Sequence, residues 1–146
     1  MAEHKVLLDR VALSAFFDGA FPVAARPSFG EVTFVEPNHV RLTLQPLPEM
    51  ERPGNIVSGP ALMGLIDVAA YGVVLAHIGP VPMAVTHTMS VSFLRACRWK
   101  AVIADARLMK LGKRLATIDV RVWQESEDQL IAQSTVGYAL PGPITT

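Results

Sequence analysis

Asp67 is the residue whose type and position in this sequence most clearly suggest chemistry. It is the only acidic or basic side chain between Arg52 and His77, in the most apolar stretch of the chain. A lone carboxylate is costly to bury unless it has a partner or water. We therefore expect either a structural aspartate that bonds a neighbouring loop, or a catalytic carboxylate that acts as base or nucleophile.

The second feature is the run Ser58-Gly59-Pro60, which is typical of the start of a helix. Backbone N–H groups at such an end point outward with partial positive charge and can hold an oxyanion. The same run also suits a capped helix start without any chemistry. Asp67 lies about 13 Å from Ser58 along a helix axis at 1.5 Å per residue. If both groups act on one substrate atom, a second subunit must supply one of them.

These residues belong to a long central helix, predicted from Ser58 to His77. Ser58 suits the N-cap, Pro60 suits the first turn, and Gly79-Pro80 suits the end of the helix. The apolar residues lie on every side of this helix. A helix that is apolar all round is buried all round, so the rest of the chain is expected to wrap it.

The remaining elements follow from periodicity and turn signals. A helix is predicted at 4–19, and strands are predicted at 29–36, 39–45, 83–94, 99–109, 115–124 and 130–140, with a loop at 46–57. The strand at 83–94 alternates strictly, with Val85, His87 and Met89 on one face and Thr86 and Thr88 on the other. Short turns between the later strands indicate an antiparallel meander. The prediction is one α+β domain over residues 1–146, with a curved antiparallel sheet around one helix.

Composition and charge argue against some classes of function. The 146 residues carry zero formal net charge and no basic stripe, which argues against nucleic-acid binding. The stretch 56–78 is long enough to cross a membrane, but Asp67 at its centre and several glycines argue against that. One cysteine, Cys97, fits a reducing, cytoplasmic location. Hydrophobic residues make up 51%, which favours a further buried interface between subunits.

Residues 54–138 resemble the PaaI-like branch of the hotdog-fold thioesterases. That branch has His-Gly-Gly at a helix start and an aspartate nine residues after the histidine; here Ser58-Gly59-Pro60 and Asp67 hold those places. The run 91–96 resembles the family's long third strand. The run 108–116 resembles its K-x-G-[KR]-x-x-A hairpin, and 130–135 resembles its closing strand.

The resemblance implies a hotdog fold and hydrolysis of an acyl-CoA thioester by a homodimer or dimer of dimers, without cofactor or metal. Asp67 would be nucleophile or general base, and the Gly59 N–H would polarise the carbonyl. Thr86 would help position water across the dimer. Further implied residues are Asn55 and Ser58 near the helix start, and Lys110, Lys113, Arg114 and Arg95 for the phosphates of coenzyme A.

Two other functions stay open. Because Ser58 replaces the family histidine, the chain could be a hotdog protein that binds acyl-CoA or a small ligand without cleaving it. The other is a hydratase or dehydratase of the same fold, whose site would have an acid and a histidine close together on the helix. Asp67 has Tyr71 four residues later instead, so this function is disfavoured.

Overall fold

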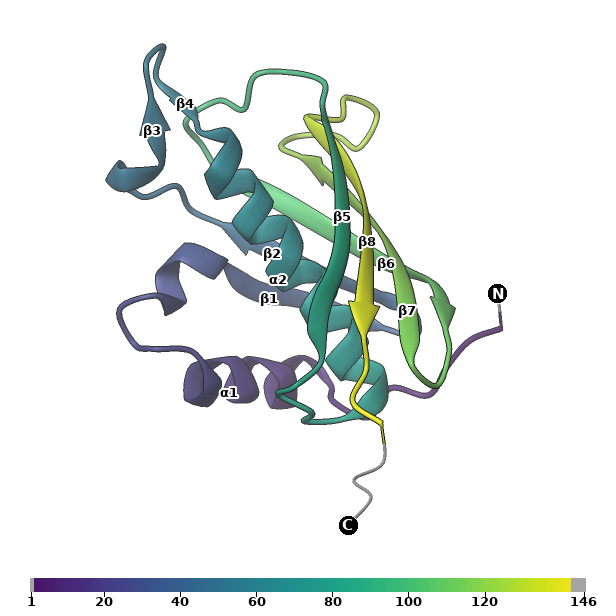
Figure 1. The fold of residues 1–146 in the computed structure, drawn as a ribbon. Coiled ribbons are helices and arrows are strands. Elements are labelled where there is room, and N and C mark those ends of the chain that lie inside the picture. Colours follow the sequence, from purple (N-terminus) through teal and green to yellow (C-terminus); the bar gives the residue numbers. More distant parts are fainter. Residues whose placement is uncertain (1, 143–146) are drawn as a thin grey trace.

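The computed structural model of the protein describes residues 2–142. One antiparallel sheet of six strands curves around the long helix α2 (Figure 1). The elements of the sheet are β1 (Glu31–Glu36), β2 (His39–Leu44), β5 (Val85–Phe93), β6 (Val102–Leu111), β7 (Leu115–Trp123) and β8 (Ala132–Ala139). The predicted architecture, a curved sheet around one central helix, is confirmed.

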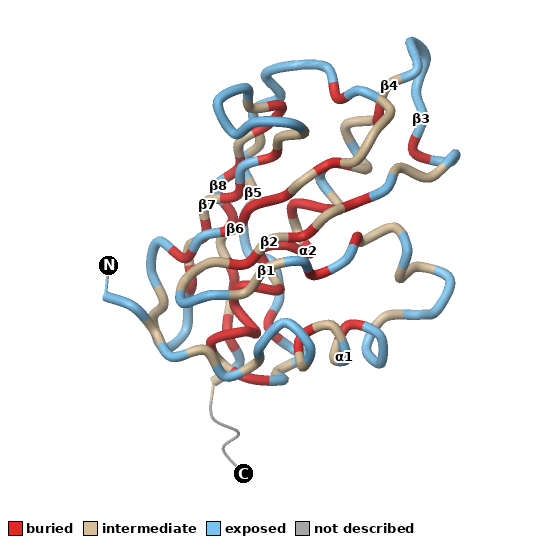
Figure 2. The backbone as a smooth tube through the Cα atoms, turned by 180° about the vertical axis from the view of Figure 1, so that it is seen from behind, coloured by how far each residue is buried: buried red, intermediate tan, exposed pale blue. Residues whose placement is uncertain are grey.

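Helix α2 spans Gly59–Ile78, one residue later at each end than predicted. The Ser58 Oγ accepts a hydrogen bond from the Ala61 N–H at 3.3 Å, which makes Ser58 the N-cap. Gly79, with φ 94°, ends the helix. Twelve of its 20 residues are buried, and these are red in Figure 2. Length and composition would let α2 cross a membrane, but 67% of its most apolar window is buried inside the protein.

The strand order is β1-β2-β6-β7-β8-β5. Strands β6, β7 and β8 form the predicted meander, but β5 pairs with β8 and not with its neighbour in sequence, β6. The loop from 94 to 101 carries the chain from one edge across to the middle of the sheet. Within the described residues, β5 therefore lies at an edge, while the meander predicted from the short turns of the later strands is confirmed for β6, β7 and β8.

Helix α1 (Arg10–Ala20) packs against α2 and β1. It begins six residues later than predicted because Asp9 caps it: the Asp9 Oδ1 accepts from the Ala12 N–H at 2.9 Å. Phe17 is fully buried. A Cβ added at Gly72 of α2 would lie 3.3 Å from the Phe17 ring. The glycine therefore lets α1 approach α2 closely.

Short elements fill the segments that precede β1 and α2. A 3-10 helix, η1 (Arg26–Phe29), occupies the predicted start of the first strand. The predicted loop at 46–57 contains a second 3-10 helix, η2 (Pro48–Met50), and a small hairpin of β3 (Glu51–Arg52) and β4 (Ile56–Val57). This hairpin leads directly into α2.

The cap at Ser58 gives the first testable prediction. Ser58→Ala should lower the free energy of unfolding by about 1 kcal/mol, because the Ala61 N–H loses its acceptor. Ser58→Asp, which keeps an acceptor oxygen at the N-cap, should retain most of the stability. Chemical denaturation of the three proteins measures both values. Equal stability of the alanine variant and the natural protein would show that the cap contributes nothing.

Candidate active site

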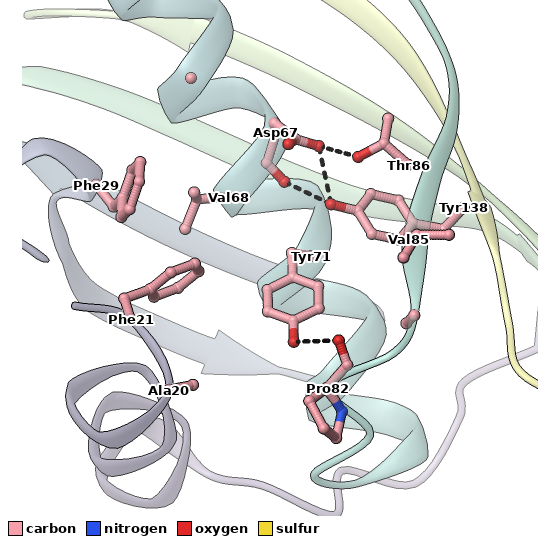
Figure 3. Close-up of a pocket in the computed structure, with 12 residues that line it drawn as sticks. Ala20, Phe21, Phe29, Asp67, Val68, Tyr71, Pro82, Val85, Thr86 and Tyr138 are labelled. Atoms are coloured by element: carbon pink, nitrogen blue, oxygen red, sulfur yellow. Dashed lines mark hydrogen bonds between the residues drawn. The ribbon is translucent and has the colours of Figure 1, made fainter. Parts of the chain in front are cut away.

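A cavity of about 530 Å³ lies between α1, α2 and the start of β5. Its wall is mostly apolar, and the Asp67 side chain lies on it (Figure 3). The lining residues are Ala20, Phe21, Phe29, Gly64, Asp67, Val68, Tyr71, Pro82, Ala84, Val85, Thr86 and Tyr138. An apolar cavity with a few convergent polar groups is the usual form of a small-molecule site.

The Asp67 carboxylate is bound through one of its two oxygens. Its Oδ1 accepts hydrogen bonds from the Thr86 hydroxyl at 2.5 Å and from the Tyr138 hydroxyl at 2.8 Å (Figure 3). Among residues 2–142, no hydrogen bond reaches Oδ2. Half-buried Asp67 therefore has one fixed oxygen and one oxygen left for a ligand or water.

A β-bulge brings Thr86 to Asp67. Thr86 pairs with Tyr138, while Thr88 pairs with Gly137, so His87 is the extra residue between them. A bulge shifts the side-chain alternation by one residue. Thr86 therefore shares the helix-facing side of the sheet with Tyr138, and so does Met89, which pairs with Val136. The predicted strict alternation over 83–94, which separated Thr86 from Met89, is wrong at His87.

Tyr138 on β8 is the site residue that the sequence analysis missed. The residue is 3% exposed. Burial raises the pKa of the Tyr138 hydroxyl strongly, and the charge of Asp67 raises it further. The hydroxyl therefore stays protonated and remains a donor. Sequence offers one signal for it: a tyrosine in a buried strand position needs a hydrogen-bond partner for its hydroxyl.

Aromatic side chains form the wall of the cavity on the side of α1. The Tyr71 ring lies 6.1 Å from the Phe21 ring at an interplanar angle of 67°, and the Phe21 ring lies 4.8 Å from the Phe29 ring. The Tyr71 hydroxyl donates to the Pro82 carbonyl at 3.1 Å, which ties the loop before β5 to α2. This part of the cavity is shaped for an apolar group.

The helix start does not join this site within one chain. Gly59 is the first residue of α2, and at 1.5 Å per residue it lies about 12 Å along the axis from Asp67. Ser58 uses its hydroxyl for the cap. Asn55 is exposed at the tip of the β3–β4 hairpin, with φ 57°. A Cβ added at Gly59 would lie 3.6 Å from the Phe93 ring at the far end of β5.

The basic residues predicted to bind coenzyme A fall into two groups at opposite ends of the sheet. Lys110, Lys113 and Arg114 lie at the β6–β7 hairpin, at the end where β5 begins. Arg95 follows the other end of β5, and its guanidinium donates to the Leu130 carbonyl at 2.8 Å. None of the four lines the Asp67 cavity, so the structure does not bring them together into one phosphate site.

Asp105 provides a contrast to Asp67. Its side chain, on β6, is 1% exposed and binds His39, with Arg41 and Arg107 beside it. Burial alone would raise the pKa of Asp105, but the hydrogen bond from His39 and these positive charges lower it instead. Asp105 is thus neutralised by its neighbours, as a structural carboxylate is. Asp67 has only hydroxyl partners, within the chain described, and faces a cavity.

Comparisons with known proteins identify the family and the fold of this chain. Residues 54–131 match the sequence profile of the Thioesterase superfamily. A crystal structure from Silicibacter sp. TM1040, described provisionally as a thioesterase, has 31% identity and a TM-score of 0.83, covering 95% of this chain and 96% of its own. Comparison with curated proteins gave no match.

More distant structures share the fold. Zebrafish thioesterase superfamily member 2 has 20% identity and a TM-score of 0.79, covering 92% of this chain and 99% of its own. A point mutant of the phenylacetic acid degradation protein PaaI from Thermus thermophilus has 22% identity and a TM-score of 0.68, covering 78% of this chain and 96% of its own. The predicted resemblance is confirmed: this chain belongs to the thioesterase superfamily and has its hotdog fold.

Proposed function

We propose that the protein hydrolyses acyl-CoA thioesters, with Asp67 as the catalytic carboxylate. One observation carries the proposal: the Asp67 carboxylate is held through Oδ1 by two hydroxyls, while Oδ2 is left for chemistry beside an apolar cavity. The acyl group would occupy the cavity between Tyr71, Phe21 and Phe29. Membership of the thioesterase superfamily supports the reaction class.

Two routes fit this carboxylate. As a general base, Asp67 takes a proton from water, and the water oxygen adds to the thioester carbonyl carbon. As a nucleophile, an Asp67 oxygen adds instead and forms a mixed anhydride that water then hydrolyses. In both routes the carbon–sulfur bond breaks, and the coenzyme A thiolate leaves and takes up a proton. The products are a carboxylic acid and free coenzyme A.

A homodimer would complete this site. The edge strand β5 is exposed along most of its length, and Phe93 is 51% exposed. If two β5 strands pair antiparallel about their midpoint, Phe93 of one subunit lies opposite the Val85 end of the other. Gly59 packs beside Phe93, so Gly59 of the partner subunit would approach Asp67. Its N–H could then hold the oxyanion that develops on the carbonyl.

The second candidate is a protein that binds acyl-CoA without cleaving it. The run Ser58-Gly59-Pro60 favours it, because the family histidine is absent and the Ser58 hydroxyl is engaged as a cap. The two candidates differ in one measurement, release of free coenzyme A from a panel of acyl-CoA thioesters. Tight binding without any release would favour the binding protein.

Asp67→Asn is the main test of the proposal. The amide cannot act as base or nucleophile, so kcat should fall roughly 100-fold to 10,000-fold, while binding of a non-hydrolysable acyl-CoA analogue persists. Asp119→Asn is the matched control, because Asp119 is a partly buried carboxylate on the outer face of the sheet, paired with Arg121. Near-natural turnover by Asp67→Asn would remove Asp67 from the mechanism.

The dimer has its own test. The protein should sediment as a dimer or larger assembly at micromolar concentration, and Phe93→Lys should shift it toward monomer by placing a charge in the proposed interface. Hydrolysis should fall with dissociation, because each site would lose the partner's Gly59. Met109→Lys is the control, since Met109 is an equally exposed apolar residue (56%) on β6. A stable, fully active monomer would contradict the shared site.

A further inference from the structure

We infer that Tyr138 is a positioning residue for the catalytic carboxylate. With Thr86 it holds Oδ1 of Asp67, so that Oδ2 is the oxygen that reacts. The inference rests on the proposed function, because it gives a role to a residue that acts through Asp67. It goes beyond that function by naming which carboxylate oxygen reacts and what holds the other one in place.

The Tyr138 hydroxyl contacts Asp67 at two points. It lies 2.8 Å from Oδ1 and 3.1 Å from the backbone carbonyl oxygen of the same residue. One hydroxyl therefore spans the side chain and the main chain of Asp67. This contact fixes the carboxylate relative to the axis of α2, which a bond to Oδ1 alone would not do.

The donor is itself held rigidly. Tyr138 lies on β8, which is hydrogen-bonded to β7 on one side and β5 on the other. Its ring stacks on the Tyr71 ring, with centroids 6.0 Å apart and an interplanar angle of 26°. Thr86 on β5 supplies the second donor from the neighbouring strand. The two hydroxyls therefore reach Asp67 from paired positions of one sheet.

The chemical consequence is that the two carboxylate oxygens of Asp67 have different roles. Oδ1 accepts two hydrogen bonds, and Oδ2 accepts none from residues 2–142. Donors of this kind stabilise the ionised form of a carboxylate, and rigid positioning keeps the reacting oxygen within reach of its target. Burial raises the pKa of the Tyr138 hydroxyl, so this hydroxyl stays protonated and remains a donor.

Tyr138→Phe tests the inference, because it keeps the ring and removes the hydroxyl. We expect kcat to fall roughly 10-fold to 100-fold, with KM little changed. Thr86→Val removes the other donor and should lower kcat in the same way, again with KM little changed.

Ser134→Ala is the matched control. Ser134 lies on β8 four residues before Tyr138, is fully buried, and its hydroxyl has no hydrogen-bond partner among the described residues. Its removal deletes a buried hydroxyl from the same strand without touching Asp67. The kcat and KM of this variant should match those of the natural protein.

The outcomes separate the inference from the proposed function. If Asp67→Asn is inactive while Tyr138→Phe keeps its kcat, the inference is overturned and the proposed function stands. If the natural protein releases no coenzyme A from acyl-CoA thioesters, the proposed function fails. If Asp67→Asn keeps near-natural turnover, Asp67 has no catalytic role and the inference fails with it. A Tyr138→Phe rate loss that follows only a lower melting temperature would make Tyr138 a structural residue and also overturn the inference. Should Tyr138→Phe not fold, an unchanged kcat in Thr86→Val would overturn it.

Discussion

The structure depends on one constraint: helix α2 is apolar on all sides, so most of its surface must be covered. The strongly curved sheet covers most of it, with β2, β6 and β7 packed along its length. Helix α1 covers a further side, where Gly72 leaves room for the Phe17 ring. Burial of apolar surface is the main favourable term in folding, so this wrapping positions α1 and the six-stranded sheet around α2 (Figure 1).

The candidate site lies where the wrapping is incomplete. Between the end of α1 and the start of β5, neither α1 nor the sheet closes over α2, and the gap is the cavity that Asp67 faces. This location explains how an apolar helix can carry a carboxylate without burying it completely. Asp67 is half-buried, receives two hydroxyl donors, and keeps one oxygen at the cavity. The charge is thus tolerated without the cations that surround Asp105.

Sequence predicted the features that depend on local signals. The Ser58 cap, the Pro60 first turn and the Gly79 end bound α2 to within one residue, and its all-round apolarity predicted the curved sheet. The features that depend on pairing between distant strands were not predictable. Nothing local in β5 says that it pairs with β8, and nothing in the regular alternation of residues 83–94 marks the extra residue at His87.

The residues of the candidate site also differ in whether a local signal in the sequence marks them. Asp67 stood out because its charge contrasts with its neighbours in sequence. Tyr138, 71 residues later, looks like an ordinary core residue of a strand, and only the tertiary structure brings its hydroxyl to the carboxylate. Thr86 was named from a resemblance, but the strand pattern placed it on the wrong face. Hydrogen-bond partners of a carboxylate that come from other elements leave no periodic signal in the chain.

The bulge at His87 makes the position of Thr86 sensitive to the number of residues in β5. If one residue is gained or lost between Thr86 and Met89, the part of the strand before that point exchanges its two faces. Thr86 would then point away from Asp67 even if every side chain were retained. Substitutions on the outer face of the strand leave this arrangement intact, whereas a single insertion or deletion there would remove it. Evolutionary change in this segment should therefore proceed by exchange of residues, and length changes should come in pairs.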